Sequence, residues 1–409
     1  MTAISGSSAP ATAVARGNAL ILAAAQALVG SAAPIAISTG GLAGTWLLLE
    51  DKSLATLPVT GFSAGVALGA LPAAALMRAV GRRLGFSAGA LMVAAGGVCA
   101  AASLFSDSFV LFTLSLIVVG MGGAFTQQYR FAAVDGAPRD YRARAIGIVL
   151  AGGMVAAVLG PQTARLTTGL FLPVEFAGAF LGMSVLALLG AGLLTRLQIH
   201  DAPGEALAED ALPARPLAEI VRQPRFLAAL ACGVGSYAVM SFVMTGAPLA
   251  IVACGHSTDV SFFGIQWHVL AMYGPSFFTG RIIARFGKPP VIACGLFLLA
   301  LAAVVFLGGT AVWNFWLGLA LLGAGWNFGF IGATAMVADT HRASEKNKTQ
   351  GFHDLILFSS VALASFMSGR TFVTAGWETM NFVVFPIVIL CFAALVLQGG
   401  GFRNVAAKN

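Results

Sequence analysis

Arg78-Ala-Val-Gly-Arg-Arg-Leu-Gly85 and Gly280-Arg-Ile-Ile-Ala-Arg-Phe-Gly-Lys288 are short basic segments that occupy equivalent places in the two halves of this 409-residue chain. Each follows a long apolar run and combines arginines with glycines. That composition is typical of a tight turn whose cations reach the headgroups beside a membrane-spanning helix. The repetition predicts an internal duplication of one membrane bundle.

The composition of the whole chain is that of a membrane protein. Apolar residues make up 58% and charged residues 10%, with a mean hydropathy of +0.89, whereas soluble domains carry about 25% charged residues. Apolar runs of about 20 residues mark transmembrane helices. They predict an all-α membrane protein with twelve transmembrane helices in two pseudo-symmetric sets of six: 17–39, 54–77, 84–105, 108–131, 145–168 and 172–195, then 226–253, 258–283, 289–309, 312–338, 351–372 and 377–399.

A polar stretch separates the two sets. Residues 196–225 contain prolines and acidic residues that interrupt any membrane span. We therefore expect an N-terminal six-helix bundle over 1–195, a cytoplasmic linker over 196–225 and a C-terminal six-helix bundle over 226–409. Two six-helix halves are the signature of a transporter built from repeats.

The positions of the basic residues predict the orientation. If the N-terminus is cytoplasmic, all but three of the 23 Lys and Arg residues fall on the cytoplasmic side, the exceptions being Lys52, Arg165 and Arg370. This is the positive-inside pattern, and it places both termini in the cytoplasm. The net charge of +7 then reflects membrane topology, and no nucleic-acid partner is expected.

Two residue pairs at mid-depth in the seventh and eighth segments suggest a ligand site. Met240/Met244 and His268/Met272 are each spaced i, i+4, which puts both side chains of a pair on one helix face. Thioether and neutral imidazole groups suit Cu(I) better than divalent ions, whose sites usually include thiolate or carboxylate. The alternative stays open that these side chains only pack, since methionine is common in apolar helices.

The two basic segments resemble the loop motif of the major facilitator superfamily, G-x-x-x-D-R-x-G-R-[RK]. Arg82 and Ala284 occupy the place where that motif carries aspartate. Gly152-Gly-Met-Val-Ala-Ala-Val-Leu-Gly-Pro161 is similar to the fifth-helix glycine–proline motif of part of the same superfamily. The resemblance implies twelve helices that move cargo by alternating access.

Within that superfamily the chain resembles the CcoA-like transporters. The Met-x-x-x-Met and His-x-x-x-Met pairs carry the resemblance, together with the segments around Gln127–Ala133 and Gly325–Thr334. It implies a copper importer that supplies haem–copper cbb3-type oxidase assembly, with cytoplasmic copper chaperones as partners. The metal-binding residues carried over by motif are Met240, Met244, His268 and Met272. Related members import riboflavin, so membership alone leaves the cargo open.

Further polar and aromatic residues near the predicted helices are candidates for the substrate pathway or its gates, because polar groups at membrane depth are costly. Arg130 also suits a helix-end anchor, Asn327 a bond between helices, and the His353–Asp354 pair a helix cap. The candidates are Gln127, Arg130, Trp267, Tyr273, Trp326, Asn327, His353 and Asp354.

These patterns predict a secondary transporter and no enzyme, because the sequence contains no P-loop and no nucleophile–base constellation. We expect import of copper, as Cu(I), across the bacterial inner membrane. Lipid is the surrounding partner, and no permanently bound cofactor is expected. The alternatives are import of riboflavin or another small aromatic solute, which would use Trp267, Tyr273, Trp326 and Asn327, and then multidrug antiport.

Overall fold

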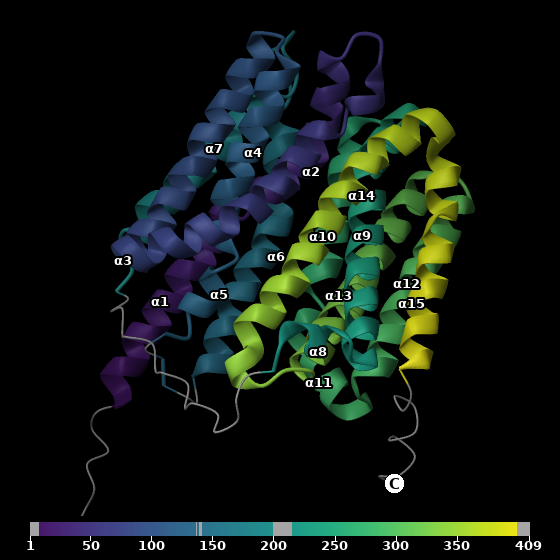
Figure 1. The fold of residues 1–409 in the computed structure, drawn as a ribbon. Helices are drawn as coiled ribbons and strands as arrows, with labels where there is room; N and C mark the ends of the chain where they lie inside the picture. The colour runs from purple at the N-terminus through teal and green to yellow at the C-terminus, as the bar shows by residue number, and fades with distance from the viewer. Residues whose placement is uncertain (1–7, 136, 139–140, 199–214, 399–409) are drawn as a thin grey trace, which may run out of the picture. The chain divides into compact units, whose positions relative to one another are not determined.

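The structure is a computed structural model that describes residues 8–135, 137–138, 141–198 and 215–398 (Figure 1). Within these ranges every regular element is an α-helix or a short 3-10 helix. The chain forms two compact units. The first unit comprises Met1–Leu49 and Gly61–Glu205, and the second comprises Glu50–Thr60 and Ala206–Asn409.

The first unit begins with α1 and α2, which are separated at Gly30 and Ser31. The long α3 starts in the second unit and continues into the first. The helices are α1 (Ser8–Val29), α2 (Ala32–Leu47), α3 (Leu57–Phe105), α4 (Phe109–Thr126), α5 (Tyr129–Ala132), α6 (Arg142–Thr167) and α7 (Ala177–Leu194).

The second unit contains η1 (Lys52–Leu54), the start of α3 and every helix from α8 onward. Helix α9 is its centre and contacts α10, α12, α13, α14 and α15. The later elements are α8 (Leu217–Val221), α9 (Pro224–Ala253), α10 (Thr258–Tyr273), α11 (Ser276–Phe286), α12 (Lys288–Leu307), α13 (Val312–Ala338), η2 (Ala343–Glu345), α14 (Lys346–Phe382) and α15 (Val384–Leu397).

The prediction of twelve transmembrane helices is confirmed. Within the described ranges, nine helices are long and apolar enough to cross a membrane. One of them, Lys52–Phe105, holds two predicted segments. Two further segments are built from shorter pieces, α10 with α11, and the end of α14 with α15. The predicted domain boundaries stay predictions, because residues 199–214 of the proposed linker lie outside the described ranges.

The two basic segments form the same turn. Gly81 has φ 81° and ψ 161°, and Gly287 has φ 85° and ψ 167°. A positive φ at this value strains any residue with a Cβ, so glycine is required at both turns. When the two segments are aligned on this turn, Gly81 corresponds to Gly287. Three residues earlier, Arg78, rather than Arg82, then corresponds to Ala284. Arg82 instead forms an ion pair with Asp135.

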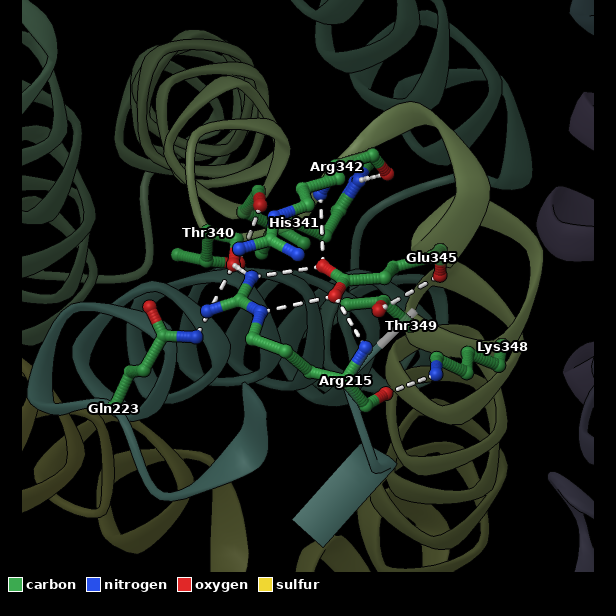
Figure 2. A network of polar contacts seen from close by, with 9 residues as sticks. Arg215, Gln223, Thr340, His341, Arg342, Glu345, Lys348 and Thr349 are labelled. Carbon is green, nitrogen blue, oxygen red and sulfur yellow. Dashed lines mark hydrogen bonds and ion pairs between the residues drawn. The ribbon is translucent and has the colours of Figure 1, made fainter. Parts of the chain in front are cut away.

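A network of charged groups fixes the start of α14 (Figure 2). The Glu345 carboxylate accepts hydrogen bonds from Arg215 Nε (2.9 Å), Arg215 Nη2 (2.8 Å) and the backbone N–H groups of Arg215 (2.8 Å) and Arg342 (2.9 Å). The carbonyl of Thr340 accepts from both Arg215 and Gln223. The network ties the chain before α8 to the loop between α13 and α14.

Candidate functional site

Four aromatic side chains meet in the second unit where α9, α13 and α14 lie together. Tyr237 packs edge to face against Trp326 (ring centroids 5.3 Å apart), Phe330 (5.1 Å) and Phe358 (6.3 Å). Trp326 and Phe330 are stacked, with centroids 5.1 Å apart and planes at 18°. All four are half-buried. We call Tyr237, Trp326, Phe330 and Phe358 the aromatic cluster.

The helices place these rings together through their spacing. Trp326 and Phe330 are four residues apart on α13, so both lie on one face of that helix. Tyr237 comes from the centre of α9, and Phe358 from the first half of α14. Flat aromatic faces of this kind can stack against a planar ligand.

Two buried nitrogen atoms on the helices that carry the aromatic cluster have no hydrogen-bond partner among the described residues: Trp326 Nε1 and His353 Nε2. The His353 side chain lies between α9 and α13, because a Cβ built on Gly233 would stand 3.5 Å from Nε2 and 3.5 Å from Ala333 Cβ. Gly233 is one helical turn before Tyr237. A buried polar group without a partner costs about 1–3 kcal/mol. A ligand that forms hydrogen bonds with these two nitrogen atoms would remove that cost.

His353 is oriented by its neighbour in the sequence. Its Nδ1 lies 2.9 Å from Asp354 Oδ1, and the residue is 3% exposed. A carboxylate only accepts hydrogen bonds, which assigns the ring proton to Nδ1 and leaves Nε2 as an acceptor in the neutral imidazole. Trp326 Nε1–H is a donor. The site thus offers one donor and one acceptor next to flat aromatic walls.

Asn327, a predicted pathway residue, is engaged in bonds between helices. Its Oδ1 accepts from Thr279 Oγ1 at 2.7 Å, and its Nδ2 donates to Met272 O and Ser276 Oγ, both at 2.6 Å. These contacts join α13 to α10 and α11. The side chain therefore holds the helices together and has no spare hydrogen for a ligand.

The four residues predicted to bind metal all lie in the second unit. Met240, Met244 and His268 are buried, and Met272 is half-buried. His268 Nδ1 donates to the carbonyl of Leu319 on α13 at 2.8 Å, so the imidazole attaches α10 to α13. Among the described residues, no group of three His, Cys, Asp or Glu side chains is placed to hold a metal ion.

The remaining predicted residues belong to other helices than those of the aromatic cluster. Gln127, at the end of α4, and Arg130, whose guanidinium lies 4.9 Å from the Phe131 ring, are exposed in the first unit. Trp267 is 46% exposed on α10, and Tyr273 is half-buried at the end of that helix.

The sequence identified Trp326 and the His353–Asp354 pair but missed Tyr237, Phe330 and Phe358. The i, i+4 pair Trp326/Phe330 was a signal that could have been read. Nothing in the sequence placed Tyr237 or Phe358 beside that pair, because they come from helices far away in the chain.

Comparison with known proteins gives the family. The model of the Major Facilitator Superfamily matches residues 17–352. The riboflavin transporter RfnT of Brucella anthropi is 51% identical over 386 residues, which cover 94% of this chain and 96% of RfnT. Two uncharacterised transporters of Bacillus subtilis, YddS and YdeG, are 28% and 27% identical; the matches cover 84% and 92% of this chain, and 84% and 90% of those proteins.

The fold has solved counterparts as well. The crystal structure of a D-xylose–proton symporter superposes with a TM-score of 0.67, covering 95% of this chain and 97% of the symporter, at 15% identity. At this identity the likeness concerns the fold alone.

The expectation of copper import is wrong. RfnT, at 51% identity over nearly the whole chain, is a riboflavin transporter, which favours the alternative cargo over copper. Three expectations that depended on copper are therefore not supported either: the specific CcoA assignment, the supply of copper for oxidase assembly and the copper chaperones as partners. The reason is physical: i, i+4 methionine and histidine pairs look the same in sequence whether they bind an ion or pack between helices.

The nine helices of the described ranges that are long and apolar enough to cross a membrane, the family model that covers most of the length and the 51% identical transporter agree on the protein's class. The chain is a multi-pass membrane transporter, not an enzyme, and it belongs to the major facilitator superfamily.

Proposed function

We propose that this transporter imports riboflavin across the bacterial inner membrane by alternating access, with both termini in the cytoplasm. The observation that carries the proposal is the 51% identity to the riboflavin transporter RfnT over nearly the full length of both chains. The distribution of Lys and Arg supports the orientation.

The aromatic cluster supports the cargo. Riboflavin has a flat, uncharged tricyclic ring whose pyrimidine edge carries an N–H group and carbonyl oxygens, and a ribityl chain with hydroxyl groups. The ring would stack on the faces of Trp326 and Phe330, and Tyr237 would close one side. Stacking a flat heterocycle on an aromatic side chain contributes about 1–3 kcal/mol by alanine substitution.

The two unpartnered nitrogen atoms supply the polar recognition. Trp326 Nε1–H would donate to a ring carbonyl. His353 Nε2 would accept from the ring N–H or from a ribityl hydroxyl, while Asp354 holds the imidazole in the required tautomer. A site that pairs with a ligand's polar groups rejects analogues that lack them, because its own buried groups then stay unpaired.

Other predicted residues take structural roles in this proposal. Asn327 positions α13 against α10 and α11, and His268 attaches α10 to α13. Met240, Met244 and Met272 fill the spaces between helices of the second unit. No substrate contact is assigned to Gln127, Arg130, Trp267 or Tyr273.

Uptake of radiolabelled riboflavin by cells that lack their own importer tests the proposal. We expect Trp326→Ala to raise KM about tenfold or more, because about 1.4 kcal/mol corresponds to a factor of ten. The matched control is Trp313→Ala, which removes the same residue type from the same helix at a position that is 59% exposed. If cells that express the wild-type protein take up no riboflavin above background, the proposal is overturned.

Two variants of His353 separate recognition from packing. His353→Gln keeps an acceptor near the position of Nε2, whereas His353→Ala removes it. We expect a larger rise in KM for the alanine variant, with similar amounts of folded protein. Lumiflavin, which has the ring but no ribityl chain, distinguishes the two partners: if His353 binds the ribityl chain, the alanine variant loses its disadvantage with this analogue.

A further inference from the structure

The glycines of α9 differ in what surrounds them. A Cβ built on Gly235 would stand 2.3 Å from Cys391 Sγ. A Cβ built on Gly246 would stand 2.6 Å from Met380 Cε and 2.9 Å from Ser368 Oγ. Heavy atoms in contact normally lie about 3.5–4.0 Å apart. Close packing against α15 and α14 therefore accounts for glycine at these two positions.

Gly233 is different, because packing does not require it. Outside the backbone of its own helix, a Cβ built there would meet two atoms within 4 Å, Ala333 Cβ and His353 Nε2, each at 3.5 Å. These are ordinary contact distances, so an alanine would fit. Glycine in the middle of a helix also destabilises it relative to alanine. We call the space bounded by Gly233, Ala333 and His353 the glycine niche.

The acceptor that borders the glycine niche is buried and unused. His353 is 3% exposed, and its Nε2 has no hydrogen-bond partner among the described residues. Asp354 accepts from Nδ1, which leaves a lone pair on Nε2. The niche has about the size of a methyl group, because a Cβ would fill it at contact distance. A hydroxyl group is of similar size and can donate to that lone pair.

The glycine niche lies one helical turn from the aromatic cluster. Gly233 precedes Tyr237 by four residues on α9, and Ala333 follows Phe330 by three on α13. Residues so spaced share a helix face, and one turn rises about 5.4 Å. The two helices run in opposite directions, since Tyr237 meets Phe330 and Gly233 meets Ala333. Both steps therefore lead to the same side of the cluster.

We propose that the glycine niche receives a hydroxyl group from the ligand's flexible chain, and that Gly233 determines specificity because its missing side chain admits that hydroxyl. The inference rests on the proposed function, and it assigns His353 Nε2 to the ribityl chain rather than to the ring. The pyrimidine N–H of riboflavin stands between two carbonyl groups of a rigid ring, which is too wide for a methyl-sized space. A ribityl hydroxyl is narrow, and rotatable bonds carry it away from rings stacked on the aromatic cluster.

Filling the glycine niche with a methyl group tests this specificity. Gly233→Ala should raise the KM for riboflavin about tenfold, because the methyl group excludes the hydroxyl and leaves Nε2 unpaired. The potency of lumiflavin as a competitor should not change, since lumiflavin has no ribityl chain. Gly280→Ala is the matched control, because it makes the same substitution within α11 at a position where a Cβ meets open space. An unchanged KM for riboflavin in Gly233→Ala, or an equal loss for both flavins, would overturn the proposal.

A hydroxyl supplied by the protein tests the acceptor without any cargo. Gly233→Ser carries its hydroxyl on a Cβ that stands 3.5 Å from Nε2, within reach of a hydrogen bond. We expect the melting temperature of Gly233→Ser relative to Gly233→Ala to be about 2 °C higher with His353 present than with His353→Ala. This double-mutant comparison isolates the bond between the added hydroxyl and Nε2.

The outcomes separate the glycine niche from the proposed cargo. If the melting temperatures show no dependence on His353, Nε2 is not a free acceptor and the proposal is overturned. If the dependence is present but cells that express the wild-type protein take up no riboflavin, the proposed cargo is wrong, and the niche remains a hydroxyl site for another ligand with a flexible chain.

Discussion

The start and the middle of α14 are held within the second unit by different kinds of hydrogen bond. At its start, the buried Glu345 carboxylate accepts four hydrogen bonds of 2.8–2.9 Å from Arg215 and Arg342. Further along, Ser365 and Gly369 meet Thr56 and Thr60, in segment 50–60, through neutral hydrogen bonds of 3.2–3.3 Å. We call these four residues the hydroxyl contact. Hydrogen bonds to ionised groups are shorter and about twice as strong as neutral ones.

The difference separates a fixed joint from a movable one. Opening the Glu345 network would expose or strand a buried carboxylate and a guanidinium, which is strongly unfavourable. Opening the hydroxyl contact exchanges one set of neutral partners for another. The loop before α14 is therefore attached more firmly than the middle of the helix.

The largest effect is expected from breaking the fixed joint. Glu345→Ala leaves four donors without their acceptor, three of them on Arg215 and the fourth the backbone N–H of Arg342. We expect a several-fold lower amount of folded protein, because a destabilisation of about 1–2 kcal/mol is enough to change abundance several-fold in cells. Fluorescence-detected size exclusion measures it, with Glu345→Gln as the milder control. Wild-type levels of Glu345→Ala would show that the Glu345 network is not needed for folding.

Acid should weaken the fixed joint and spare the hydroxyl contact. Hydrogen bonds from Arg215 hold the pKa of Glu345 well below its usual range, and the Arg342 N–H acts in the same direction. A lowered pKa in the folded state gives stability that is fully present above the unfolded value, about 4.3, and is lost as pH falls through the folded pKa.

Thermal unfolding of the detergent-solubilised protein from pH 8 to pH 4 measures this dependence. The advantage of wild type over Glu345→Gln should be constant down to about pH 5 and shrink below the unfolded pKa of about 4.3. Loss of the advantage between pH 8 and pH 6 would contradict the assignment to the carboxylate.

A smaller effect is expected at Asp339, the other carboxylate at this end of the unit. It pairs with Arg225 at 2.6 Å and with Lys288. Burial alone would raise its pKa, but the bonds to Lys288 and Arg225 outweigh burial and lower it. The pairs are partly exposed, so Asp339→Asn should cost about 1 kcal/mol or less. The loss should be smaller still at high salt; a loss independent of salt would indicate a buried joint like that of Glu345.

The smallest effect on stability is expected from Thr245→Val, which removes one weak hydroxyl bond to Ser365 and keeps the shape. The melting temperature should stay close to that of wild type. In a variant that also carries Thr60→Cys, the rate of labelling by N-ethylmaleimide should rise modestly. Thr334→Val, whose hydroxyl bonds only to its own helix, is the matched control. A large loss of stability would show that the hydroxyl contact stabilises the fold as strongly as the Glu345 network does.

The architecture was predictable because apolar length and basic loops are local signals. Segments such as 226–253 and 312–338 match α9 and α13 within two residues. The first segment ended too early, since the apolar, glycine-rich residues after 39 continue α2 to Leu47. The Gly274–Pro275 pair splits the eighth segment into α10 and α11, which hydropathy alone does not detect.

The candidate site was less predictable, because it depends on contacts between distant residues. Trp326 was a candidate because it lies mid-way along the tenth segment, and His353 because it begins the eleventh beside Asp354. Nothing in the sequence sets Tyr237, Phe330 or Phe358 apart from the many other aromatic residues until the helices meet. The methionine pairs were one basis for the expectation of copper import, and whether they bind a ligand stays a prediction. Their spacing defines a helix face, and a face alone does not distinguish an ion from a neighbouring helix.

The Thr56 hydroxyl inserted into α14 has a consequence for measurement. The amide hydrogen of Gly369 is bonded to that hydroxyl at 3.2 Å, so its exchange with deuterium depends on whether segment 50–60 is seated. Native-state exchange reads such openings site by site. A peptide spanning Gly369 therefore reports whether segment 50–60 is seated on α14, in a protein that carries no substitution.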